Sequence, residues 1–113
     1  MPQEPLQIED LGATPTSQRV LRLKGPILLS NFFQFQALVR ADTSHILILD
    51  MTDVPYIDSA GIGALVGAYV THQKEGRGLA LAGVTDRVRN AMQVTRIEQF
   101  FTFFENVAAA QAQ

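Results

Sequence analysis

Ser59 is the side chain in this sequence best placed to do chemistry, because it follows Asp58 at the start of an expected helix. A serine nucleophile needs a base within hydrogen-bonding reach. His72 lies thirteen residues further along the same expected helix, or about 20 Å away at 1.5 Å per residue. His45 precedes the strand that leads to the serine and is also separated from it by roughly 20 Å. Ile57 stands where a G-x-S-x-G nucleophile elbow requires glycine. We therefore expect no serine hydrolase and no catalytic residue.

Three glycines after the serine raise the alternative of nucleotide binding. Gly61, Gly63 and Gly67 form G-x-G-x-x-x-G, and Asp86 follows the next expected strand, where a ribose-binding acid could lie. In dinucleotide-binding folds, however, these glycines form a tight turn directly after the strand, whereas here we expect the intervening loop 50–58. The last two glycines then fall inside the helix, and no P-loop lysine follows. The sequence predicts no cofactor.

The glycines inside the helix still require an explanation. Each costs up to ~1 kcal/mol relative to alanine. One explanation is close approach of the helix to the sheet or to a neighbouring helix. The other is a small-residue face, completed by Ala60, Ala64 and Ala68, that lets a partner come near. The residues favour neither.

Phosphorylation of Ser59 is the remaining chemistry. The first turn of a helix exposes backbone amides that favour negative charge, so it tolerates a phosphate of about −1.5 to −2. A partner bound over that turn would face a bulky dianion, with Asp58 adding to the repulsion. Alternatively, the serine only caps the helix, as serine commonly does. Both interpretations are compatible with the residues.

Composition limits the classes of protein to consider. The chain has 113 residues, which predicts one domain covering 1–113, and its net charge of −2 argues against nucleic acid as a partner. There are no cysteines and only two histidines, so we expect no metal site. No apolar run approaches the ~18 residues of a membrane span, and the acidic, proline-broken start is not a signal peptide. We therefore expect a soluble, cytoplasmic protein without membrane partners.

Hydrophobic periodicity predicts nine elements in the order β-β-α-β-α-β-α-β-α. This alternation is typical of an α/β fold in which helices pack on a mixed, mainly parallel sheet of four to five strands. A turn is expected at 12–17, between the first two strands. The expected strands are 3–11, 19–24, 46–49, 79–84 and 97–104, and the expected helices are 29–40, 59–75, 85–94 and 107–111.

Two helices carry apolar stripes that we expect to face the core. In the helix 29–40, which Ser30 or Asn31 would cap, the stripe leaves Phe33 outside. Phe33 is then either a partly buried flank of the core or an exposed aromatic that meets a partner. The stripes consist of Phe32, Phe35, Leu38 and Val39 in that helix, and of Ile62, Leu65, Val66, Tyr69 and Val70 in the helix 59–75.

The segment LDMTDVPYIDSAGIGALVGAYV resembles the core motif of STAS domains, the family of bacterial anti-sigma-factor antagonists. The order of the elements and the LKG sequence at 23–25 extend the resemblance over nearly the whole chain. It implies a non-enzymatic, STAS-like domain that binds an anti-sigma factor when unphosphorylated. The partner, a serine kinase, would phosphorylate Ser59 and be released, and a serine phosphatase would reverse the reaction. Ala60, where the family often has a second hydroxyl residue, leaves one acceptor in the motif.

The turn at 25–28 departs from the regulatory members, which often carry two acids there, whereas this chain reads Gly-Pro-Ile-Leu. Such a turn is similar to STAS segments of anion transporters. The alternative is therefore a phosphorylation-independent scaffold or interaction module, which assembles with another domain or as a homodimer. For either function, the residues expected to contact the partner are Leu28, Phe33, Asp58, Ser59, Ala60, Gly61, Gly63, Ala64 and Gly67.

Overall fold

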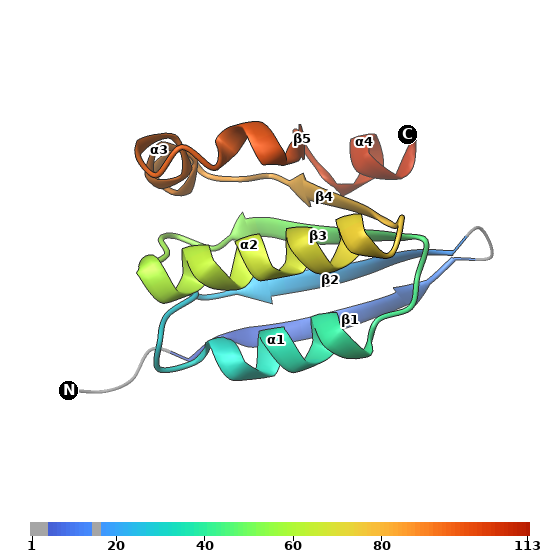
Figure 1. The fold of residues 1–113 in the computed structure, drawn as a ribbon, viewed down its shortest axis with the longest axis horizontal. Helices are drawn as coiled ribbons and strands as arrows, with labels where there is room; N and C mark the ends of the chain where they lie inside the picture. The colour runs from blue at the N-terminus through green and yellow to red at the C-terminus, as the bar shows by residue number, and fades with distance from the viewer. Residues whose placement is uncertain (1–4, 15–16) are drawn as a thin grey trace.

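A computed structural model describes residues 5–14 and 17–113 and confirms the α/β class (Figure 1). One five-stranded sheet has the spatial order β1-β2-β3-β4-β5. The strands are β1 (Gln7–Ala13), β2 (Gln18–Lys24), β3 (Ile46–Asp53), β4 (Gly78–Ala82) and β5 (Thr102–Phe104). The helices are α1 (Phe32–Ala41), α2 (Ser59–Lys74), α3 (Asp86–Val94) and α4 (Val107–Gln111), with a short 3-10 helix, η1, at Glu98–Phe100.

The sheet is antiparallel only between β1 and β2, as the sequence predicted. The other strands are parallel because a helix connects each to the next and returns the chain to the same edge. The first strand begins later than expected and continues through Gly12, where a bulge interrupts its pairing. The expected strand residues Gln3 and Glu4, and Pro15 and Thr16 of the expected turn, lie outside the described residues.

β3 is longer than the apolar run that predicted it, and the expected loop 50–58 is shortened to 54–58. The strand continues because Asp50, although buried, has partners for its carboxylate. Its Oδ1 accepts a hydrogen bond from Thr52 Oγ1 at 2.6 Å, and its Oδ2 accepts one from Arg22 Nε at 3.2 Å. The longer strand brings the site-bearing loop close to the sheet.

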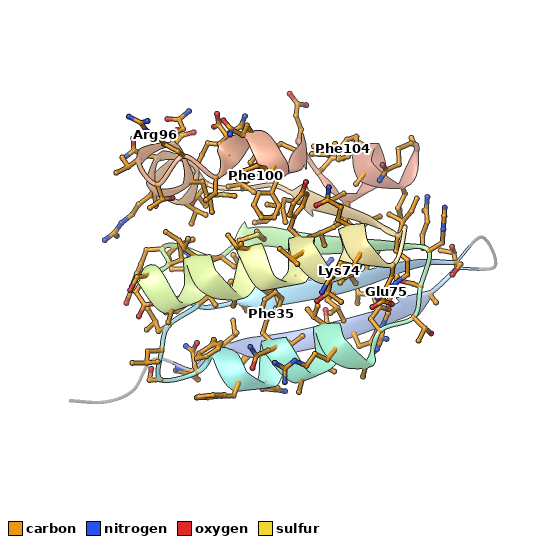
Figure 2. All side chains as sticks on the ribbon, viewed as in Figure 1. Phe35, Lys74, Glu75, Arg96, Phe100 and Phe104 are labelled. Carbon is orange, nitrogen blue, oxygen red and sulfur yellow. The ribbon has the colours of Figure 1, made fainter. Side chains whose placement is uncertain are left out.

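The helices α1 and α2 lie side by side over one face of the sheet, with both N-terminal ends on the same side of the molecule (Figure 1). Phe35 of α1 is fully buried between the helices and the sheet (Figure 2). The predicted α1 stripe is confirmed, with Phe35 and Val39 buried and the other two residues packed against the core. The opposite face carries a smaller apolar cluster, in which Ala110 of α4 packs with Val20, Ile48, Ala80 and Ala82.

The segment 97–104 was predicted as one strand, which is wrong: it forms η1 followed by the three-residue β5. Arg96 adopts a positive φ of 61°, which reverses the chain after α3. Arg89 Nε then donates to Glu98 Oε2 at 2.6 Å and holds the turn against α3. The apolar residues of this segment predicted a strand, but the ion pair between Arg89 and Glu98 stabilises a turn there instead.

Candidate functional site

Asp58 caps α2 and joins it to the neighbouring loop. Its backbone is extended (φ −99°, ψ −173°), and its Oδ1 accepts a hydrogen bond from the Gly61 amide at 2.9 Å. Its Oδ2 accepts a second hydrogen bond from the Leu29 amide at 3.0 Å. The interpretation of Ser59 as the helix cap is therefore wrong, because Asp58 performs that role.

Ser59 is the first residue of α2 and is exposed to solvent. Neither its hydroxyl nor the backbone amides of Ser59 and Ala60 have a hydrogen-bonding partner among residues 5–14 and 17–113. Unsatisfied amides at a helix start carry the positive end of the helix dipole. The site therefore consists of an accessible hydroxyl beside a surface that favours negative charge.

The turn after β2 contacts the start of α2 through backbone atoms of Ile27. Ile27 forms a parallel bridge with Ile57, and the Ile27 carbonyl accepts a hydrogen bond from the Asp58 amide at 3.3 Å. Gly61 sits on the same carbonyl: a Cβ built there would lie 2.3 Å from its oxygen. Close approach of backbone to backbone thus explains Gly61, which is buried.

Gly63 and Gly67 differ from Gly61, because a Cβ at either position would meet nothing within 4 Å. Both residues are exposed on the outer side of α2, one and two turns beyond Ser59. Close approach within the chain therefore does not explain them. Of the two explanations that the sequence left open, a face kept small for a partner remains a proposal.

The apolar stripe expected on α2 is confirmed only in part, because Leu65 is fully buried and Tyr69 packs against the core, whereas Val70 is exposed. The side that faces the core consists of Gly61, Ala64, Leu65, Ala68 and His72. Apart from Leu65 and His72, these residues are small and let the helix lie close to the sheet and to α1. Ile62, Val66 and Tyr69 are half-buried, and Val70 is 44% exposed.

The predicted partner-binding residues in and before α2 differ in their exposure to solvent. Gly61 and Ala64 face the interior and cannot form a docking surface directly. Ser59, Gly63 and Gly67 are exposed, and Asp58 and Ala60 are half-buried beside them.

An apolar rim lies next to the helix start. Leu29 and Phe33 are large hydrophobic side chains, yet each is 64% exposed. The neighbouring Leu28 is half-buried. The Phe33 ring lies 4.3 Å from that of Phe32, centroid to centroid, and is supported by it. Phe33 is therefore an exposed aromatic, not a flank of the core. The sequence did not identify Leu29 as a residue of this surface, because it was expected to be the first residue of a helix. The helix α1 in fact begins three residues later, at Phe32.

Asn31 was a candidate cap for α1 but does not cap it by a side-chain hydrogen bond. Its Oδ1 instead accepts from the Leu28 amide at 2.8 Å, and its Nδ2 donates to the Pro26 carbonyl at 2.9 Å. Asn31 thereby fixes the turn that carries Leu28 and Leu29.

His72, weighed as a base for Ser59, is buried at the other end of α2. Its Nδ1 lies 2.8 Å from the Ala68 carbonyl oxygen, and its Nε2 lies 3.6 Å from Asp42 Oδ2. Asp42 also accepts from Arg77 Nη1 at 3.0 Å and from Ser44 Oγ at 2.8 Å. This cluster joins the C-terminal ends of α1 and α2.

A cavity lies away from Ser59. It measures about 430 Å³ at the end of the parallel strands and is lined by Thr52, Gly83, Val84, Arg89, Phe103, Phe104 and Glu105. Within the part of the chain that the structure describes, no three acidic, histidine or cysteine side chains gather as metal ligands. The described helices also include none that is long and apolar enough to cross a bilayer.

Comparisons with known proteins agree with this description. An anti-sigma-B factor antagonist from Listeria monocytogenes is 36% identical over 50 residues, and the aligned segment spans 44% of each chain. A sulfate transporter family protein from Wolinella succinogenes has a similar fold, with a TM-score of 0.74, 24% identity and coverage of 89% of this chain and 87% of that chain. The Bacillus cell fate determinant SpoIIAA in its phosphorylated form has a TM-score of 0.68, 17% identity and coverage of 96% and 99%.

The family model of the STAS domain matches residues 11–110, which include the whole of the Ser59 site and all five strands in whole or part. The chain therefore belongs to the STAS domain family.

Proposed function

We propose that this protein is a bacterial, cytoplasmic anti-sigma-factor antagonist controlled by phosphorylation of Ser59. The unphosphorylated form binds an anti-sigma factor that has serine kinase activity, and the phosphorylated form does not. The observation that carries the proposal is the exposed, unbonded Ser59 hydroxyl at the start of α2, with Asp58 already serving as the cap.

The fold can accept the phosphate without a large rearrangement. The amides of Ser59 and Ala60 are available to an anion of about −1.5 to −2, and the helix dipole favours it there. The nearest carboxylate, Asp58, is already held by the amides of Gly61 and Leu29 and stays in place. Phosphorylation therefore changes the charge of the surface and leaves its shape largely intact.

The negative charge of the phosphate would repel a partner bound over Ser59. The exposed Leu29 and Phe33 supply apolar contact next to Ser59, and burying a dianion in such an interface is costly. The name of the Listeria relative supports the antagonist role, and SpoIIAA, which has a similar fold, has a structure in a phosphorylated form. A serine phosphatase would return the protein to the binding form.

The kinase test uses the cognate anti-sigma factor with ATP and intact-mass measurement. Wild type should gain one phosphate and Ser59→Ala none. Ser30→Ala is the matched control, since Ser30 is an exposed serine in the neighbouring loop and should leave phosphorylation unchanged. Addition of phosphate to Ser59→Ala, or none to wild type, contradicts the proposal.

A phosphorylation-independent scaffold is the second candidate. The turn 25–28 lacks acidic residues, and the fold is similar to that of the Wolinella transporter family protein. Binding of the anti-sigma factor by Ser59→Asp, measured by calorimetry, separates the two functions. A loss of at least tenfold in affinity supports the switch, whereas unchanged affinity together with loss in Phe33→Asp supports the scaffold.

A further inference from the structure

The cavity of about 430 Å³ plays no part in the function proposed above. It lies outside the carboxyl ends of β3, β4 and β5, and its lining includes the last residue of β5 and the residues directly after β4 and β5. Ligands of open α/β sheets bind in crevices at this edge of the sheet. The volume is also within the range of small-molecule binding sites.

The crevice exists because the chain leaves β4 and β5 toward opposite faces of the sheet. Val88 and Met92 of α3 pack into the core that α1 and α2 cover. Val107 and Ala110 of α4 pack into the smaller apolar cluster on the other face. The loops that follow these two neighbouring strands therefore diverge, and they leave a space between them that no described helix fills.

Arg89 lines this crevice with part of its guanidinium group free. Its Nε donates to Glu98 Oε2 at 2.6 Å, and its Cζ lies 3.7 Å from the centroid of the Phe103 ring. Nη1 and Nη2 have no partner among residues 5–14 and 17–113. These two nitrogens of a guanidinium group match the two oxygens of a carboxylate. The ion pair and the ring thus hold Arg89 in place to bind a carboxylate.

Glu105 brings a negative charge to the same lining. Its side chain is exposed and forms no hydrogen bond or ion pair, with Arg89 or with any other described residue. Because Glu98 already balances the charge of Arg89, the carboxylate of Glu105 leaves this end of the sheet with an excess of negative charge. A ligand with a carboxylate alone would be repelled, whereas a ligand that also carries an ammonium group would have a partner for each charge.

We propose that this crevice binds a free α-amino acid with an apolar side chain. The carboxylate of the ligand binds Nη1 and Nη2 of Arg89, and its ammonium group faces the Glu105 carboxylate. Its side chain lies against Val84 and Phe104, the apolar residues of the lining on which no cation is stacked. The site does not include Ser59, so the inference is independent of the phosphorylation switch.

The wall on the β3 side is already formed without a ligand. Gly83 lies so close to Thr52 that a Cβ built there would be 2.2 Å from Thr52 Oγ1. That hydroxyl donates to Asp50 Oδ1 at 2.6 Å, and the Gly83 amide donates to the Phe104 carbonyl at 3.0 Å. These contacts fix the loop after β4 to both neighbouring strands, so little order has to be created on binding.

Nuclear magnetic resonance titration of the whole chain tests the ligand class with three probes. Phenylalanine carries both charges, 3-phenylpropionate only the carboxylate, and phenethylamine only the ammonium group. Phenylalanine should bind with a dissociation constant on the order of 2 mM, a value ordinary for a ligand of its size, and should shift the amide signals of Gly83, Val84 and Glu105. Each of the other probes should bind at least about fivefold more weakly.

Glu105→Gln separates the two charges, because it should act in opposite directions on two probes. It should weaken phenylalanine at least about fivefold and strengthen 3-phenylpropionate, a reversal that a general loss of structure does not produce. Arg89→Lys keeps the positive charge but loses the paired nitrogens, and should weaken both probes. Glu75→Gln is the matched control and should change nothing, since the exposed Glu75 precedes β4 at the opposite edge of the sheet.

Three results would overturn the proposal. The first is no shift of these amides by phenylalanine at about 20 mM, roughly ten times the expected dissociation constant. The second is binding of 3-phenylpropionate or inorganic phosphate to wild type as tightly as phenylalanine, which would indicate a site for anions only. The third is unchanged binding of phenylalanine by a folded Glu105→Gln variant.

Discussion

The three glycines of α2 should respond in opposite ways to the same substitution. Gly63 and Gly67 have open space where a side chain would begin, so alanine at either should fit without displacing an atom. Alanine in a helix interior is more stable than glycine by about 0.5–1 kcal/mol. The double variant should therefore gain about 1–2 kcal/mol in the free energy of unfolding, or roughly 5–10 °C in Tm.

Gly61→Ala should have the reverse effect. The new Cβ would lie 2.3 Å from the Ile27 carbonyl oxygen, a backbone atom that also accepts the hydrogen bond from the Asp58 amide. The loop must shift or the helix must lift, and overpacking of this kind costs about 1–3 kcal/mol. The helix propensity gained is smaller than this cost, so the net change should be destabilising.

Urea unfolding followed by circular dichroism would measure both effects. Equal m-values would show that the variants share one unfolding transition. Loss of stability in the double variant would refute the open space outside Gly63 and Gly67. Wild-type stability in Gly61→Ala would refute the close contact with Ile27. The same double variant should bind partners less well, if these glycines are kept small for docking.

Two further predictions concern acidic residues that organise the site. Asp58→Ala removes both the cap of α2 and the link to Leu29, and should cost about 1–2 kcal/mol in urea unfolding. Asp58→Asn has one acceptor oxygen, so it should keep the cap, lose the link to Leu29 and cost less than Asp58→Ala; equal losses would contradict capping by the side-chain oxygen. Burial raises the pKa of Asp50, but hydrogen bonds from Thr52 and Arg22 outweigh it and hold the pKa below its ordinary value of 3.8. Its stabilisation is therefore present above about pH 4 and is lost as the pH falls through the lowered pKa, so Asp50→Asn should be less stable near pH 7 and approach wild type near pH 2. A stability difference independent of pH would contradict this.

The sequence by itself determined the order of the elements and the position of the serine. Hydrophobic periodicity is a local property, and it predicted the four helices, the antiparallel start and the central strand. Thr85 and Asn106, which directly precede α3 and α4, cap these helices by accepting hydrogen bonds from the Val88 and Ala109 amides. Distance along regular elements also separated His72 from Ser59.

The sequence could not determine where charged residues find partners. The expected strand ended with the apolar run at Leu49, but Asp50 continues it because Thr52 on the same strand and Arg22 on β2 bond to its carboxylate. For the same reason, the apolar segment around Glu98 became a turn held by Arg89 instead of a strand. Such pairs depend on which segments the sheet brings together.

The direction of α2 was decided by tertiary packing alone. Its residues are apolar or small on every side, so periodicity gave no unique buried face, and the larger side chains were assigned to the core. The close fit of Gly61 on Ile27, with Ala64 and Ala68 against the interior, leaves Val70 exposed, while Leu65 stays buried as expected. Backbone proximity thus exposes Val70, Gly63 and Ser59 together, because small residues let the helix approach the sheet.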